Sequence, residues 1–323
     1  MSWLQRLKID SFLLVLVSVV MLATVFPCTG VYKTFFGHLT TAAIALLFFM
    51  HGAKLSREAV LAGLGHWKLH LLVLASTFVL FPLLGLVLGV AVPTLLTPGV
   101  HAGFLYLCAL PATVQSAIAF TSLARGNVAA AICSASASSL LGVFLSPLLV
   151  GFLMHAQGGQ TDTLHAIGAI ITQLMLPFIL GHLSRPLTAK WVERHRKLIG
   201  MTDRSSILLV IYTAFSAAVI EGIWQQVDAA SLFSIVLVSC LLLAIVLAIN
   251  TFAARALGFD TADEITIVFC GSKKSLANGI PMANVLFPAA TVGMMVLPLM
   301  MFHQIQLMVC AVLAQRYARR AGD

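Results

Sequence analysis

Charged residues are scarce in this sequence, at 9% of 323 residues, whereas about 25% is usual for soluble domains. Hydrophobic residues make up 60% and the mean hydropathy is +1.02, which together exclude an ordinary soluble domain. The number of membrane-spanning segments, rather than of soluble domains, then describes the architecture. The composition predicts an all-α polytopic membrane protein.

Catalytic and metal-binding signatures are also missing. The sequence has no HExxH, no pair of intramembrane aspartates, no nucleophile elbow and no phosphate-binding glycine loop. The six cysteines form no CxxC pair and lie mostly in apolar runs, which favours buried apolar side chains over disulfides or a metal site. The remaining candidate for nucleophilic catalysis is a Ser–Lys dyad, made of Ser272 or Ser275 with Lys273 or Lys274. Adjacent serines and lysines are common by chance, so this candidate has little support. We expect no enzyme, no resident cofactor and no metal.

Ten apolar segments account for most of the chain: residues 11–27, 39–52, 69–92, 102–123, 128–154, 164–183, 206–223, 231–256, 262–286 and 290–314. Sixteen of the nineteen Lys and Arg residues fall in one set of alternate loops, and the opposite loops hold only Lys33. Because cytoplasmic loops are rich in Lys and Arg, this bias places both termini in the cytoplasm and requires an even number of spans. The net charge of +8 therefore indicates orientation in the inner membrane and not nucleic-acid binding.

The two halves of the chain show weak internal similarity. Shifting segment 102–123 by 162 residues places Cys108 on Cys270 and Thr113 on Ser275. Five spans in each half would make the second half enter the membrane from the opposite side, which is the topology of an inverted repeat. We expect a first five-helix repeat at 1–155, a connection at 156–163 and a second repeat at 164–323.

The segment 268–282 is the most unusual part of the chain. It holds Lys273 and Lys274, the only charges predicted at mid-membrane, each of which costs about 2.5–3.5 kcal/mol to insert. Gly271, Gly279 and Pro281 interrupt a regular helix there. Irregular, charged backbone at this depth is tolerated only inside protein or beside a water-filled cavity, so the pattern predicts the discontinuous helix of a transporter.

Pro111 interrupts the fourth segment at the matching place, beside several hydroxyl and amide side chains. A simple proline kink is the alternative. In the fifth segment Ser134, Ser138 and Gly142 recur every four residues, which favours close helix packing, although the hydroxyls could complete a site. His303 could relay protons, but a neutral, hydrogen-bonded side chain is favoured because no acid is nearby.

These patterns select one set of candidates for binding substrate or ions where the two broken segments meet: Lys273, Lys274, Ser272, Ser275, Asn278, Thr113, Gln115, Ser116, Ser134 and Ser138. Further candidates for a polar lining are His303, Gln304, Gln306 and Asn250. Lys273 is the first choice among the lysines because it lies nearer to Gly271.

Two motifs carry a resemblance to a known family: Leu-Ala-Arg-Gly-Asn-Val-Ala at 123–129 and Cys-Gly-Ser-Lys-Lys-Ser-Leu-Ala-Asn-Gly at 270–279. They resemble the bile acid–sodium symporter family, and the lysines resemble its YfeH-type bacterial branch. The resemblance implies ten helices in two inverted repeats, with broken helices 4 and 9 crossing in a core domain beside a panel domain. Substrate would bind between panel and core, and rocking would give alternating access. Well-studied members bind two sodium ions behind the crossing, with a glutamate and a glutamine in helix 9.

The sequence departs from that pattern at the sodium ligands. Aligning Gly271 with the family glycine puts Phe269 in place of the glutamate and Lys273 in place of the glutamine. Two like charges about 4 Å apart repel by about 4 kcal/mol at an effective dielectric of 20. The hypothesis is that a lysine ammonium occupies one cation position, so that transport is uncoupled from that sodium or coupled to protons.

The sequence thus predicts a symporter-like secondary transporter of a small organic anion in the lipid bilayer, with sodium or a proton as the open choice of coupling ion. One alternative is a metalloid oxyanion exporter, for which Cys108 is suggestive. Another is a transport-inactive membrane regulator of ion handling that acts through the basic loop at 185–204. Solute, direction, stoichiometry and oligomeric state stay open.

Overall fold

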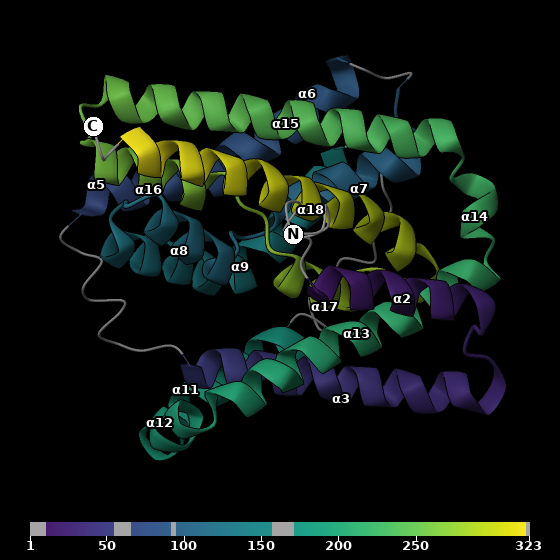
Figure 1. The fold of residues 1–323 in the computed structure, drawn as a ribbon. Coiled ribbons are helices and arrows are strands. Elements are labelled where there is room, and N and C mark those ends of the chain that lie inside the picture. Colours follow the sequence, from purple (N-terminus) through teal and green to yellow (C-terminus); the bar gives the residue numbers. More distant parts are fainter. Residues whose placement is uncertain (1–10, 55–65, 92–94, 157–170, 321–323) are drawn as a thin grey trace, which may run out of the picture.

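The computed structural model describes residues 11–54, 66–91, 95–156 and 171–320, and every regular element in these residues is a helix (Figure 1). Six of these helices are long and apolar enough to cross a membrane, and the bent pair α7 and α8 makes a seventh if it counts as one span. The predicted all-α membrane protein is therefore confirmed. The ten predicted spans exceed this number because segments 11–27, 164–183 and 262–286 fall on helices that are short or interrupted in the described residues.

One group of helices is arranged around α13, with α3 and α11 at the bottom of Figure 1. A Cβ atom added to Gly52 of α3 would meet the Phe178 carbonyl, and one added to Gly181 of α11 would meet the Phe49 carbonyl. Glycines at a helix crossing let two backbones approach this closely within a membrane. The group comprises α2 (Ser11–Val25), α3 (Gly30–Lys54), η3 (Ile171–Met175), α11 (Leu176–Leu183), α12 (Arg185–Arg194) and α13 (Arg196–Ile220).

A second group surrounds α18 and fills the upper part of Figure 1. The helix α18 packs against α7, α15 and α17, and it also contacts α13 of the first group. The short α14 (Ile223–Gln226) leads from α13 to α15. The second group comprises α5 (Trp67–Ala75), η2 (Ser76–Leu80), α6 (Phe81–Ala91), α7 (Pro98–Ala109), α8 (Val114–Leu123), α9 (Val128–Ala156), α15 (Ala229–Ala256), α16 (Thr261–Gly271), α17 (Leu276–Leu286) and α18 (Ala289–Arg320).

The motif at 123–129 forms the turn between α8 and α9. Asn127 Oδ1 accepts a hydrogen bond from the Ala130 amide at 3.0 Å, which caps the first turn of α9. Asn127 Nδ2 donates to Asp263 at 2.9 Å, and the Thr266 hydroxyl donates to the Asn127 carbonyl at 3.1 Å. This asparagine therefore ties the start of α16 to the α8–α9 turn and sets how the two broken helices lie against each other.

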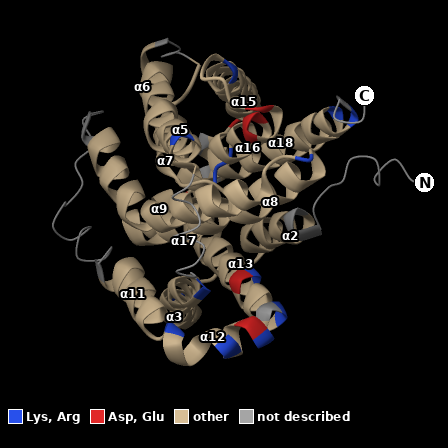
Figure 2. Ribbon diagram, turned by 90° about the vertical axis from the view of Figure 1, so that its left-hand side faces the viewer, with Lys and Arg blue, Asp and Glu red and all other residues tan. Residues whose placement is uncertain are grey.

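Lys, Arg, Asp and Glu residues, coloured blue and red in Figure 2, gather at helix ends on the side of the molecule that faces the viewer. Lys54 pairs with Asp203 at 2.5 Å, and Arg255 binds both oxygens of Glu264 at 2.8 and 2.9 Å. The acids of α16 are thus at its first turn and paired, in agreement with the prediction of no mid-membrane carboxylate there. Of the basic residues used for orientation, Arg6, Lys8 and Arg57 lie outside the described residues.

Candidate transport site

The two predicted helix breaks are present, and they contact each other. Between α7 and α8 the chain runs extended, and the two helices are bent by 66°. Between α16 and α17 the break covers residues 272–275. The Ser275 amide donates to the Pro111 carbonyl at 2.9 Å, and the Thr113 hydroxyl donates to the Lys274 carbonyl at 2.8 Å. Each break therefore supplies hydrogen-bond partners for the unpaired backbone of the other, as buried backbone in a membrane requires.

The Lys274 ammonium is fully buried and lies at the centre of this contact. Its Nζ donates to three backbone carbonyls, those of Thr77 at 2.8 Å, Cys108 at 2.8 Å and Leu110 at 2.6 Å. The Phe81 ring lies 4.2 Å from Nζ and adds a cation–π contact. All three N–H groups of an ammonium can thus be satisfied by carbonyl oxygens, a ligand type that also suits small metal cations.

These carbonyls lack helical partners for identifiable reasons. In the π-helix η2 the Phe81 amide bonds to the Ser76 carbonyl instead of that of Thr77, and the next residue, Pro82, has no N–H. The Cys108 and Leu110 carbonyls lie at the end of α7, where the helical ladder stops. The π-turn and the proline-containing break therefore create the acceptors that Lys274 fills.

Gln306 of α18 satisfies the backbone of the same lysine. Its Oε1 accepts from the Lys274 amide at 2.9 Å, and its Nε2 donates to the Lys274 carbonyl at 3.0 Å. Gln306 Nε2 also lies 2.8 Å from His303 Nδ1. The Lys274 carbonyl also lies 3.4 Å from His303 Nδ1, so this nitrogen contacts both a donor and an acceptor. Gln306 is a buried support of the break and not part of a polar lining, whereas the neutral state of His303 stays a prediction.

Lys273 points into a different environment, and the two lysines do not share a cavity. Its Nζ lies 4.3 Å from the Phe120 ring and 5.8 Å from the Phe269 ring, with the Cys270 and Cys310 thiols close by. The side chain is fully buried, and in the described residues its amine has no oxygen acceptor, so the Cys310 thiol is left as its polar neighbour. The preference for Lys273 as the lysine that binds substrate or ions stays a prediction. The carbonyl acceptors are at Lys274, because those of Thr77, Cys108 and Leu110 converge on it.

The small-residue stripe of α9 faces the break after α7. The Ser138 hydroxyl accepts from the Ala112 amide at 3.0 Å, and a Cβ added to Gly142 would clash with Pro111. Ser134 Oγ lies 2.6 Å from His70 Nδ1. The stripe thus allows close packing, and one of its hydroxyls also satisfies the broken backbone.

A cavity of about 550 Å³ lies between the two helix groups. The first group contributes side chains of α3, α11 and α13, and the second contributes α8, α9, α17 and α18. Five of the predicted residues line it: Thr113, Gln115, Ser275, Asn278 and His303. Ser139, which also lines it, accepts from Asn278 Nδ2 at 3.1 Å.

The remaining predicted residues lie away from this cavity. They are Lys273, Lys274, Ser272, Ser116, Ser134, Ser138, Gln304, Gln306 and Asn250. A side-chain polar atom of Ser116, Ser272, Gln304 and Asn250 is buried without a hydrogen-bond partner in the described part of the chain. Asn250 Nδ2 faces the end of α16, because a Cβ added to Gly271 would lie 2.7 Å from it.

The sequence missed four cationic or ionisable residues that line the cavity: His51, Lys54, Lys197 and Arg204. Lys54, Lys197 and Arg204 belong to predicted cytoplasmic loops, where the positive-inside bias is their only signal, and His51 falls at the end of the predicted span 39–52. Their approach to the broken helices depends on the packing of α13 against α17 and α18 and of α3 against α13. No sequence pattern encodes that approach.

Two broken helices in contact, beside a polar cavity in an all-helical membrane protein, are features of membrane transport proteins. A model of the SBF-like CPA transporter family matches residues 10–319, and the chain belongs to this family. The chain is 66% identical over 312 residues to a protein of Escherichia coli (strain K12) named Putative symporter YfeH, which covers 97% of this chain and 94% of that protein.

A second bacterial relative is an uncharacterized protein of Pseudomonas aeruginosa, 60% identical over 314 residues, with 97% of this chain and 94% of the relative covered. The Sodium/bile acid cotransporter 7-A of Xenopus laevis is 30% identical over 326 residues, with 97% of this chain and 93% of that protein covered. The predicted resemblance is therefore confirmed. The protein is a membrane transporter and not an enzyme.

Proposed function

We propose that the protein is a secondary-active transporter of a small organic anion and that the cavity of about 550 Å³ is its substrate site. The single observation that carries this proposal is the position of the cavity between the α13 group and the two broken helices. Its volume is within the range of small-molecule sites. In this proposal the α13 group is the panel and the α18 group is the core of a ten-span inverted repeat in the inner membrane, with both termini cytoplasmic.

The charges around the cavity favour an anion. Lys54, Lys197 and Arg204 line it together with a single acid, Asp203. The first residues of α8 and α17 also line it, and helix N-termini carry partial positive charge that attracts anions. Half-helix ends that point at anionic substrate groups are a known feature of transporters with broken helices.

Alternating access would arise from movement of the α13 group against the α18 group. The cavity walls belong to both groups, so such a movement would open and close it. Polar groups at its floor belong to the broken helices, whose mutual hydrogen bonds keep them together as one unit. The substrate would therefore contact a rigid floor and a mobile wall.

The lysines bear on the coupling ion. In this proposal the Lys274 ammonium occupies a carbonyl site, and no sodium ion is needed there. Lys273 has no such acceptors among the described residues and is the better candidate for a group that gains and loses a proton during transport. The hypothesis that a lysine ammonium occupies one cation position is thus kept, with Lys274 as that lysine.

The alternatives have less support. Cys108 is fully buried against Gly85 and does not line the cavity, so its thiol has no contact with a solute there, as an oxyanion exporter would require. A regulator without transport activity would need no cavity shared by both helix groups. The choice between transporter and regulator rests on measured flux.

The test is uptake by the purified protein in proteoliposomes. A pool of small organic anions is first screened for compounds that raise the melting temperature, and each hit is then assayed with a sodium gradient, a pH gradient or neither. We expect uptake of an anion without sodium stimulation. Matched variants are Asn278→Ala in the cavity and Lys190→Ala on α12 outside it. Strong stimulation of uptake by sodium would contradict the proposal that Lys274 replaces a sodium ion. Absence of flux for every anion that stabilises the protein would contradict the proposed transport of an organic anion.

A further inference from the structure

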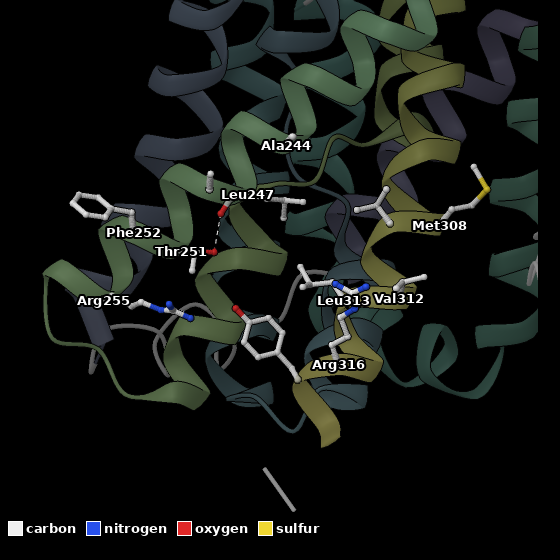
Figure 3. Close-up of a pocket in the computed structure, with 12 residues that line it drawn as sticks. Ala244, Leu247, Thr251, Phe252, Arg255, Met308, Val312, Leu313 and Arg316 are labelled. Carbon is white, nitrogen blue, oxygen red and sulfur yellow. Dashed lines mark hydrogen bonds between the residues drawn. The ribbon is translucent and has the colours of Figure 1, made fainter. Parts of the chain in front are cut away.

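A second cavity lies away from the candidate transport site, in a groove of about 820 Å³ between α15 and α18 (Figure 3). Most of its lining is apolar and exposed, with Phe252 at 74%, Val312 at 55% and Val309 at 41% exposed. Ala244 and Ala248 have small side chains that leave the space open. The one hydroxyl in the apolar part, that of Thr251, is satisfied by the Leu247 carbonyl at 2.8 Å.

The groove has one polar end. Figure 3 shows Arg255 and Arg316 toward this end and Ala244 and Met308 toward the other. Arg255 binds Glu264 through Nε and Nη2, which uses two of its five N–H groups and offsets its charge. Arg316 is exposed, and it forms no salt bridge with an acid in the described parts of the chain. The polar end therefore carries an excess of positive charge.

The length of the groove matches one leaflet of a bilayer. From Ala244 to Arg255 the helix α15 advances eleven residues, or about 16 Å at 1.5 Å per residue. Half of a hydrocarbon core is about 15 Å thick. A lipid whose acyl chain lies along the groove from the apolar end would therefore have its headgroup at the two arginines.

We propose that this groove is a binding site for an anionic phospholipid, with the acyl chain between α15 and α18 and the phosphate at Arg316 and Arg255. Arginine binds phosphate oxygens through paired N–H groups, and basic pockets between membrane helices select anionic headgroups. The site lies on the α18 group, outside the cavity that holds the transported anion. An apolar groove of this depth with a cationic end fits a lipid better than a second protein copy, whose apolar side chains would leave the arginines without partners.

The experiment measures the melting temperature of the purified full-length protein in detergent as phosphatidylglycerol or phosphatidylcholine is added. We expect phosphatidylglycerol to stabilise at a lower concentration than phosphatidylcholine. Arg316→Gln should raise by about fivefold the phosphatidylglycerol concentration that gives the same stabilisation, which corresponds to the loss of one surface charge. The stabilisation by phosphatidylcholine should not change. Arg319→Gln on the same helix, outside the groove, is the matched control and should behave as the wild type.

Ala248→Leu fills the groove from an exposed position on α15. It should weaken the binding of both lipids without unfolding the protein. Ala230→Leu, exposed near the start of α15, is its control. Native mass spectrometry should find phosphatidylglycerol retained by the wild type and lost from Ala248→Leu. Equal lipid response in Ala248→Leu and wild type would overturn the proposal. So would an unchanged phosphatidylglycerol preference in Arg316→Gln, or dimers that Ala248→Leu dissociates.

Discussion

The hydroxyl of Thr113 donates a hydrogen bond to the carbonyl of Lys274 at 2.8 Å, so that a side chain from one broken helix satisfies the backbone of the other. The Ser275 amide returns a bond to the Pro111 carbonyl. The two breaks thus stabilise each other, and neither could be buried alone without leaving unpaired backbone groups.

Thr113→Val keeps the shape of this side chain and removes its donor. We expect a loss of about 1–2 kcal/mol in stability, since the Lys274 carbonyl then loses its shortest hydrogen bond and keeps the longer contacts to Gln306 and His303. Thr113→Ser retains the hydroxyl and is the matched control. Melting temperatures in detergent compare the two variants, and equal values would show that the hydrogen bond does not hold the breaks together.

The two lysines should respond in opposite ways to the same substitution. Lys274→Met removes three hydrogen bonds from a charged group and leaves three carbonyls without that donor, so we expect a loss of about 3 kcal/mol or more. Lys273→Met removes a buried amine that has no oxygen acceptor in the described residues, and stability should be unchanged or higher.

Thermal unfolding in detergent measures this contrast. Lys274→Arg should be destabilised like Lys274→Met, because a planar guanidinium does not fit three carbonyls that converge on one nitrogen. If Lys273→Met destabilises as much as Lys274→Met, the assignment of separate roles to the two lysines is wrong.

Gly52→Ala should separate α3 from α11. The added methyl would meet the Phe178 carbonyl, and backbone cannot move aside as a flexible side chain can, so we expect a loss of about 1–3 kcal/mol. Gly37→Ala on the same helix has no atom within 4 Å of the new methyl and is the matched control. A melting temperature for Gly52→Ala equal to that of Gly37→Ala would refute the close contact.

Lys197→Ala and Arg204→Ala remove cationic groups from the cavity lining. In the proposed function each should raise the KM for anion uptake several-fold, by about 1 kcal/mol of lost attraction, with little change in kcat. The effect should shrink at high ionic strength because exposed charges are screened. Lys190→Ala, on α12 and outside the cavity, should keep the wild-type KM.

The membrane fold class and the two helix breaks were predictable from the sequence because each has a local cause. A run of apolar residues must be helical in lipid, since backbone groups have no water to bind there. Pro111 lies in the break after α7, and Gly271 is the last residue of α16. Gly279 and Pro281, which were also expected to interrupt a helix, lie inside α17. The family motif at 123–129 was equally recognisable, although the links from Asn127 to Asp263 and Thr266 became known only from the structure.

The roles of the individual site residues were not local properties. Lys273 and Lys274 are adjacent and chemically identical, and the sequence distinguishes them only by their distance from Gly271. The carbonyls of Thr77, Cys108 and Leu110, which lie 164 to 197 positions away in the chain, decide which lysine has acceptors. Likewise the cavity takes its positive charges from α3 and α13, which reach it only through helix packing.

The sequence by itself therefore determined an all-helical membrane protein with two charged or polar helix breaks, because composition and helix-breaking residues act within a few positions. Only the tertiary structure decided that the breaks complete each other, that Lys274 and not Lys273 fills the carbonyl site, and which side chains face the cavity. The physical reason is that hydrogen-bond satisfaction of buried groups depends on partners from distant parts of the chain.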